Sequence, residues 1–118
     1  MIHVTVDRDG KGRFESMTIS GHAGSGPYGF DLVCAGVSAV SFGAIHAVSE
    51  LCGFEMDVYQ AEDGGFLECR FPSAMPFNHR EKAEWLMEGM LASLRLIENS
   101  YSEHIHIQVS GGGSHAKA

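Results

Sequence analysis

The chain has 118 residues, of which 44% are hydrophobic, 19% are charged and 15 are glycine. This length suits one domain and is too short for two. The apolar content excludes intrinsic disorder, and the glycine content with the low charge excludes a coiled coil. A net charge of −7 and the lack of a basic run argue against a nucleic acid partner and favour small molecules, peptides or basic proteins.

The cysteines and the N-terminal residues indicate a cytoplasmic protein. Cys34, Cys52 and Cys69 are widely spaced and form no CxxC motif, so neither a disulfide framework nor a zinc ribbon is indicated. Charge appears too early in the chain for a secretory signal. Residues 32–49 carry no formal charge, but their serines, alanines and glycines favour a tightly packed core helix over a membrane span.

The first half of the chain predicts a β-hairpin followed by a helix. Residues 2–7 alternate apolar and polar side chains, residues 9–12 form a turn, and a second strand covers about residues 13–20. Phe14 is out of step with this second strand, which indicates a bulge near the turn. Residues 21–29 predict a mobile loop, after which Asp31 caps a helix over about residues 32–52. The apolar face of this helix is predicted from its spacing to contain Val33, Val37, Val40, Ala44, Val48 and Leu51.

The second half repeats this pattern. A second hairpin turns at residues 62–65, and a helix with one apolar face covers about residues 79–100. The last strand is predicted at residues 104–109, followed by a flexible tail over residues 111–118. The order ββαββαβ predicts a single α+β domain over residues 1–110, built as a two-layer sandwich of two helices on a mostly antiparallel sheet.

The glycine-rich segment before the first helix contains the pattern GxGxxG at Gly24, Gly26 and Gly29. A dinucleotide site is not indicated, because a hairpin precedes the segment and the carboxylate of Asp31 would repel a pyrophosphate. His3, His104 and His106 meet if the terminal strands pair, but no carboxylate or cysteine has matching spacing. We therefore predict no metal site.

His22 and Cys34 are the candidate catalytic pair. With Asp31 as N-cap, Cys34 is the third residue of the predicted helix, where the helix N-terminus stabilises a thiolate by about 0.3–1 kcal/mol. An ordinary cysteine with a pKa near 8.5 is only about 3% ionised at pH 7, and the Asp31 carboxylate opposes ionisation. A cationic partner is therefore needed, and His22 at the end of the second strand can supply it. Imidazole beside a thiol is the base and nucleophile of acyl transfer and peptide hydrolysis.

Two further residues have alternatives that the sequence leaves open. Ser38 lies one helical turn after Cys34 on the same face and can donate a hydrogen bond to the thiolate or to an oxyanion. Asp31 either caps the helix or orients His22, and we favour the cap. The alternative to catalysis is a cysteine that only packs, on the flank of the valine stripe with Ser38 and Ser41. The chain would then be a non-enzymatic ribosome-assembly or peptide-binding module.

The run Gly21-His22-Ala23, seven further residues, and then Asp31-Leu32-Val33-Cys34-Ala35-Gly36-Val37-Ser38-Ala39 closely resembles the signature of the Prp family of ribosomal-processing cysteine proteases. The resemblance extends over nearly the whole chain. Leu32 and Gly36 replace the more usual Ile and Ala, and neither change touches the chemistry.

The resemblance implies a homodimeric cytoplasmic endopeptidase without a cofactor. Its relatives remove a short N-terminal extension from a protein of the large ribosomal subunit, and a basic ribosomal protein suits an acidic enzyme. Carried over, Cys34 is the nucleophile, His22 the general base, and Asp31 and Ser38 are supporting residues. The expected substrate loop comprises Gly21, Ala23, Gly24, Ser25, Gly26, Pro27, Tyr28, Gly29 and Phe30, and we expect it to close over an extended peptide.

Overall fold

A computed structural model describes residues 1–21, 28–62, 64–75 and 77–111 of the chain. In this part of the chain, strands and helices follow the predicted order ββαββαβ. Their bounds are β1 (Ile2–Arg8), β2 (Phe14–Ser20), α1 (Tyr28–Cys52), β3 (Asp57–Gln60), β4 (Phe66–Arg70), α2 (Phe77–Ser100) and β5 (Ile105–Gly111).

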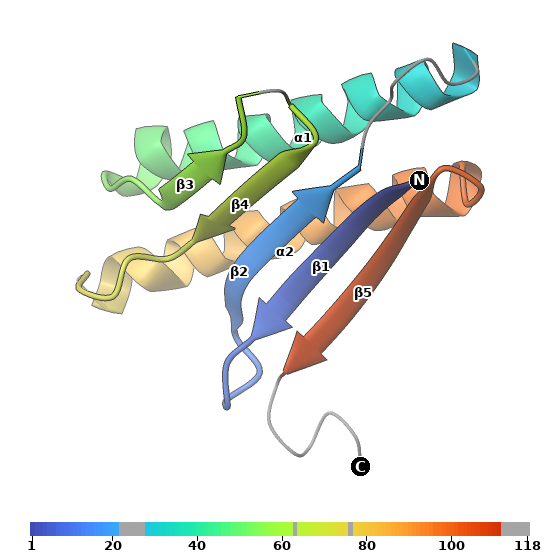
Figure 1. The fold of residues 1–118 in the computed structure, drawn as a ribbon. Helices are drawn as coiled ribbons and strands as arrows, with labels where there is room; N and C mark the ends of the chain where they lie inside the picture. Colours follow the sequence, from blue (N-terminus) through green and yellow to red (C-terminus); the bar gives the residue numbers. More distant parts are fainter. Residues whose placement is uncertain (22–27, 63, 76, 112–118) are drawn as a thin grey trace.

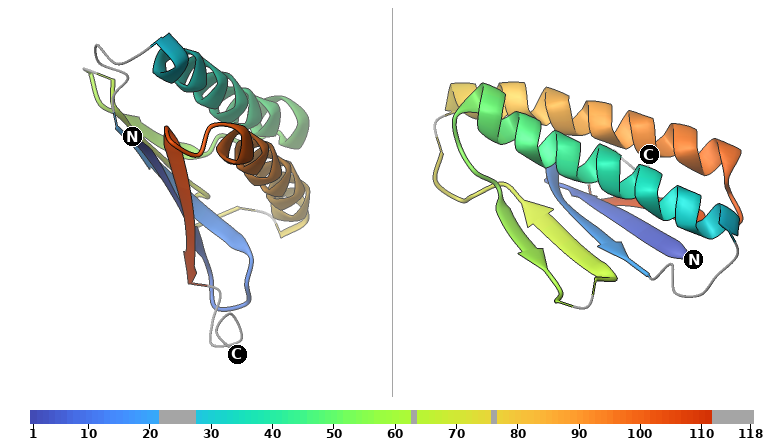
Figure 2. Two further views of the ribbon diagram at one scale, coloured as in Figure 1. Left: turned by 90° about the vertical axis from the view of Figure 1, so that its right-hand side faces the viewer. Right: turned by 90° about the horizontal axis from the view of Figure 1, so that it is seen from above.

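The strands form one sheet in the order β3-β4-β2-β1-β5 (Figure 1). β1 pairs with β5 in parallel, and the other neighbours are antiparallel. α1 and α2 lie side by side on the same face of the sheet (Figure 2). The predicted two-layer α+β sandwich with a mostly antiparallel sheet is therefore confirmed.

The alternating residues of β1 build the sheet side of the core. Ile2, Val4 and Val6 are buried beneath the helices, whereas the residues between them are more exposed. The register with β2 shifts between Asp7 and Arg8, and Phe14 is fully buried although it is out of step with the rest of β2. The predicted bulge is confirmed, and it lets a large aromatic side chain close the turn end of the core.

α1 begins earlier than predicted, at Tyr28. Tyr28, Gly29 and Phe30 belong to the helix and not to a loop, and Asp31 is its fourth residue and not its N-cap. The prediction gave too much weight to Asp31 as a helix-start residue and to the glycines before it. It overlooked Pro27, which directly precedes the helix, although proline is common where helices begin.

The buried face of α1 differs in part from the predicted one. Val33, Val37 and Val48 are buried as predicted, but Leu51 is 67% exposed and Cys52 takes the buried position. Ser41 is fully buried, so its predicted place on the flank of the stripe is wrong. By length and composition alone α1 could cross a membrane from residue 32 onward, but in the fold it packs on the sheet and on α2.

α2 completes the core and is tied to the sheet by ion pairs. Its face with Ala83, Met87, Met90 and Leu94 is buried as predicted. Arg8 at the end of β1 forms a two-pronged ion pair with Glu88 of α2. Within the helix, Arg80 donates a single hydrogen bond of 2.8 Å through Nε to Glu84.

The edges of the sheet are β3 on one side and β5 on the other. All four residues of β3 are exposed. At the other edge, Gly111 belongs to β5 and not to the predicted tail. Its φ is +83°, and a Cβ added to it would lie 2.2 Å from the carbonyl oxygen of Arg8. Only glycine fits such a place. The rest of the predicted tail, residues 112–118, lies outside the described residues.

Candidate active site

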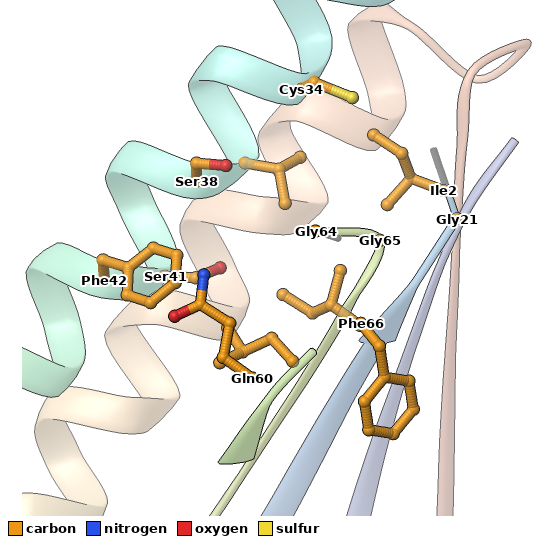
Figure 3. A pocket seen from close by; sticks show the side chains of 13 residues that line it. Ile2, Gly21, Cys34, Ser38, Ser41, Phe42, Gln60, Gly64, Gly65 and Phe66 are labelled. Atoms are coloured by element: carbon orange, nitrogen blue, oxygen red, sulfur yellow. The ribbon is translucent and has the colours of Figure 1, made fainter. Parts of the chain in front are cut away.

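A cavity of about 350 Å³ lies between α1 and the sheet, and Cys34 lines it (Figure 3). α1 also contributes Ser38 and Ser41, the end of β2 contributes Gly21, and the β3–β4 turn contributes Gly64. Among the described residues that line the cavity, none carries a formal charge. The cavity can therefore accept an apolar or polar uncharged group, such as a segment of peptide, at low desolvation cost.

Cys34 stands at the boundary between the core and this cavity. It is partly buried and packs against the hydrophobic core, and its sulfur points from α1 toward the strand ends where Ile2 and Gly21 lie (Figure 3). Because α1 begins at Tyr28, Cys34 is the seventh residue of the helix and not the third. The field of a helix N-terminus falls off within the first turn, so the predicted stabilisation of the thiolate by the helix is weaker than the sequence indicated.

The two serines of the cavity differ in their exposure. Ser38 is exposed and lies one turn after Cys34, and both residues line the cavity, as their spacing predicted. Ser41 is fully buried, and its hydroxyl has no hydrogen-bond partner among the described residues. Sequence reasoning grouped Ser41 with Cys34 and Ser38 on one flank of the helix but did not predict its burial, because its sequence neighbours carry no sign of it.

The β3–β4 turn is fastened to the chain directly before His22. The amide of Gly21 donates a hydrogen bond of 3.0 Å to the carbonyl oxygen of Gly65. Gly21 has φ +117°, and a Cβ there would lie 2.3 Å from the carbonyl oxygen of Met1. Gly64 and Gly65 also have positive φ, at 77° and 79°. The sequence predicted this turn but not its position beside the cysteine.

His22 lies outside the described residues, as do Ala23, Gly24, Ser25, Gly26 and Pro27. The pairing of His22 with Cys34 therefore stays a prediction. Gly21, which precedes His22 in the sequence, is described and lines the cavity.

Among the described residues, no other cysteine and no histidine lines this cavity. Cys52 and Cys69 are buried in the core, and burial raises the pKa of the Cys69 thiol to about 12. The terminal strands pair, and the rings of His3 and His106 lie 6.4 Å apart. Within the described ranges, no group of three or more histidine, cysteine or acidic residues is arranged to hold a metal ion.

A partly buried thiol at the edge of a cavity, held by an α+β sandwich, supplies the nucleophile and the binding space that a thiol-dependent hydrolase needs. Comparison with known proteins identifies the family within this class. The chain belongs to the cysteine protease Prp family, whose model matches residues 1–106. The ribosomal processing cysteine protease Prp of Bacillus subtilis (strain 168) is 42% identical over 107 residues, which cover 91% of this chain and 96% of the relative.

Two solved structures of a ribosomal processing protease Prp from S. aureus have the same fold. One, in complex with a substrate peptide, matches with a TM-score of 0.83 and 32% identity, covering 93% of this chain and 100% of that one. The other, with a covalently linked product peptide, has a TM-score of 0.81 and 33% identity at the same coverage. The predicted fold class and the resemblance to the Prp family are both confirmed.

Proposed function

We propose that this cysteine protease removes the N-terminal extension of a precursor of a large-subunit ribosomal protein. The observation that carries the proposal is the Cys34 thiol at the edge of a cavity whose described lining residues are all uncharged. Membership of the Prp family supports it, as do the relatives named for ribosomal processing and the S. aureus structures that hold substrate and product peptides.

In the proposed mechanism, Cys34 is the nucleophile and His22 the general base. His22 takes the thiol proton, and the thiolate attacks the scissile carbonyl carbon to form a C–S bond. The protonated His22 then gives its proton to the leaving amine as the C–N bond breaks. His22 next deprotonates a water molecule, which hydrolyses the acyl-enzyme and regenerates the thiol. Backbone amides near Cys34 and the exposed hydroxyl of Ser38 are the donors we propose for the oxyanion.

We assign Asp31 the role of orienting His22. As the fourth residue of α1, Asp31 is not the N-cap, so the alternative role that we favoured from the sequence is wrong. A carboxylate that holds an imidazole in one tautomer also stabilises its protonated form. Asp31→Asn is therefore expected to lose most of its activity while it keeps its fold. An enzyme that cuts at close to the wild-type rate after this change would exclude the orienting role.

The proposal is tested with the extended and mature forms of the ribosomal protein from the same organism. The wild-type chain should shorten only the extended form, with one cleavage site identified by mass spectrometry of the products. Cys34→Ala and His22→Ala should fold and leave the substrate uncut. Cys52→Ala and His46→Ala are the matched controls, because Cys52 is buried at the far end of α1 and His46 is exposed on it. Full cleavage by Cys34→Ala would overturn the assignment.

We also propose that the chain acts in the cytoplasm as a homodimer. The outer face of α1 supports a second copy as partner, because it exposes the uncharged residues Leu32, Ala35, Ala39 and Phe42 in successive turns. Such a stripe of small and apolar residues suits close packing of one helix on another. Sedimentation should give twice the monomer mass, and Ala39→Glu should give the monomer. A wild-type chain that is monomeric throughout the concentration range would exclude the dimer.

A further inference from the structure

The hydroxyl of Ser41 is an unusual feature of this fold. The side chain of Ser41 is fully buried, and its oxygen has no hydrogen-bond partner among the described residues. A buried serine in a helix commonly donates to the carbonyl group one turn earlier, but no such bond forms here. Native proteins leave few buried polar atoms unsatisfied, because each one lowers stability. An unsatisfied hydroxyl in a ligand cavity therefore points to a partner that the ligand brings.

The cavity around Ser41 limits what that partner can be. Val37, Ile19 and Leu67 give its walls an apolar character, and the part of the lining that the structure describes contains no charged residue. A charged side chain would lose its hydration there without gaining a counter-ion. An uncharged group with an amide or hydroxyl can instead give or take a hydrogen bond from a serine, which is both donor and acceptor.

Ser41 lies at a definite distance from the proposed nucleophile. It follows Cys34 by two helical turns and lines the same cavity (Figure 3). Seven residues of helix rise by about 10 Å. A peptide bound along α1 in an extended conformation advances about 3.3 Å per residue, so about three residues separate the bond at Cys34 from the position beside Ser41.

Ser41 is closed to solvent, so a peptide side chain reaches it only when a neighbouring side chain rotates. Gln60 lines this end of the cavity and is exposed at the surface (Figure 3). Exposed side chains change rotamer rapidly, whereas the buried valines of α1 are held by the core.

We propose that Ser41 is a specificity-determining residue, whose hydroxyl hydrogen-bonds an uncharged polar side chain of the peptide about three residues from the scissile bond. This inference rests on the proposed function, because it takes Cys34 as the point of cleavage. It assigns a buried residue outside the catalytic pair to the choice of substrate.

The test uses short peptides that span the cleavage site of the extended ribosomal protein. Each position on either side of the scissile bond is occupied in turn by Gln and by Met, which have similar length and differ in the amide. At one position about three residues from the bond, the wild-type enzyme should prefer Gln over Met by about three- to tenfold in kcat/KM, the range expected of one neutral hydrogen bond. Ser41→Ala should cut both peptides at equal rates.

Stability and a control separate this role from a merely structural one. Because Ser41→Ala removes an unsatisfied buried hydroxyl, its Tm should stay unchanged or rise. Ser93→Ala is the matched control, since the Ser93 hydroxyl is exposed on α2 and bonds the carbonyl oxygen of Gly89. It should keep the wild-type preference. A Ser41→Ala enzyme that keeps the preference, or that loses activity equally on all peptides, would overturn the inference.

A binding measurement separates this inference from the proposed function. Fluorescence anisotropy with the Cys34→Ala variant compares the Gln and Met peptides without cleavage. One outcome is that the wild-type chain cuts none of the peptides, but Cys34→Ala binds the Gln peptide more tightly and the added Ser41→Ala change removes this preference. The proposed function is then wrong, and the Ser41 subsite stands. If binding shows no preference that depends on Ser41, the subsite is excluded even where Cys34-dependent cleavage is observed.

Discussion

Alkylation of the native protein should modify Cys34 far faster than Cys69. Iodoacetamide reacts with thiolate, so its rate depends on the ionised fraction and on access to the sulfur. Cys34 is partly buried at a cavity, whereas Cys69 is fully buried in β4. A non-enzymatic module in which Cys34 only packs predicts the opposite behaviour, because its thiol would lag with the core cysteines.

The structure sets the magnitude of this difference. Burial raises the pKa of Cys69 to about 12, so at pH 8 only about one molecule in 10⁴ carries a Cys69 thiolate. A cysteine with the ordinary pKa of about 8.5 is about one quarter ionised at the same pH. Ionisation alone therefore favours an accessible thiol over Cys69 by about 10³-fold. The burial of Cys69 slows its reaction further, because the reagent requires local opening.

The assay is a time course with iodoacetamide at pH 8, followed by digestion and quantification of the three cysteine-containing peptides by mass spectrometry. In guanidinium chloride the three rates should converge, which provides the control for intrinsic reactivity. Rates for Cys34 and Cys69 that agree within tenfold in the native protein would refute the reasoning. So would modification of Cys52 before Cys34, because Cys52 is buried at the end of α1.

Three further predictions concern the fold around the site. The pKa of Cys69 is raised, so between about pH 9 and 12 the unfolded chain releases a proton that the folded chain keeps, and stability falls as pH rises. Between pH 8 and pH 10, the free energy of unfolding measured in urea should fall by about 1.4 kcal/mol more for wild type than for Cys69→Val. An equal fall in both proteins would contradict the raised pKa of Cys69. Partial burial would raise the pKa of Asp9, but hydrogen bonds from the turn amides and from Arg13 outweigh it and lower the pKa. Asp9→Ala should thus cost about 1–2 kcal/mol at pH 7, and this difference should vanish in urea titrations as the pH falls below 3.8. Gly21→Ala places a Cβ 2.3 Å from a backbone carbonyl oxygen at φ +117°, so it should lower the free energy of unfolding by at least about 1 kcal/mol. A Cβ at Gly10 meets nothing within 4 Å, so Gly10→Ala should leave the thermal denaturation unchanged.

The order of elements was predictable because local patterns decide it. Apolar residues alternate with polar ones in β1 and recur about every 3.6 residues in α2, and each pattern predicts one buried face. The packing of these faces on each other gives the sandwich. Even the bulge could be predicted, since Phe14 is a large apolar residue on the wrong alternation for its strand. Each of these inferences uses residues that are close together in the sequence.

The start of α1 and the shape of the site depend on contacts that local patterns do not contain. Asp31 has the chemistry of an N-cap, but residues before it continue the helix. The burial of Ser41 results from the sheet beneath α1, and its sequence neighbours do not distinguish it from the exposed Ser38. The approach of Gly65 to Gly21 joins two hairpins that are far apart in the chain.

The earlier start of α1 changes which group must ionise the nucleophile. A cysteine at the third helical position would gain from the field of the helix N-terminus, but Cys34 is the seventh residue, beyond the first turn in which that field is strong. In the sequence a carboxylate, that of Asp31, also precedes Cys34 by three residues, and a carboxylate near a thiol opposes its ionisation. A reactive Cys34 therefore requires a cation from outside the helix. Gly21 lines the cavity and directly precedes His22 in the sequence, which is why His22 is the cation that we propose. A Cβ at Gly21 would lie 2.3 Å from the carbonyl oxygen of Met1, so the residue directly before the proposed base has to be glycine.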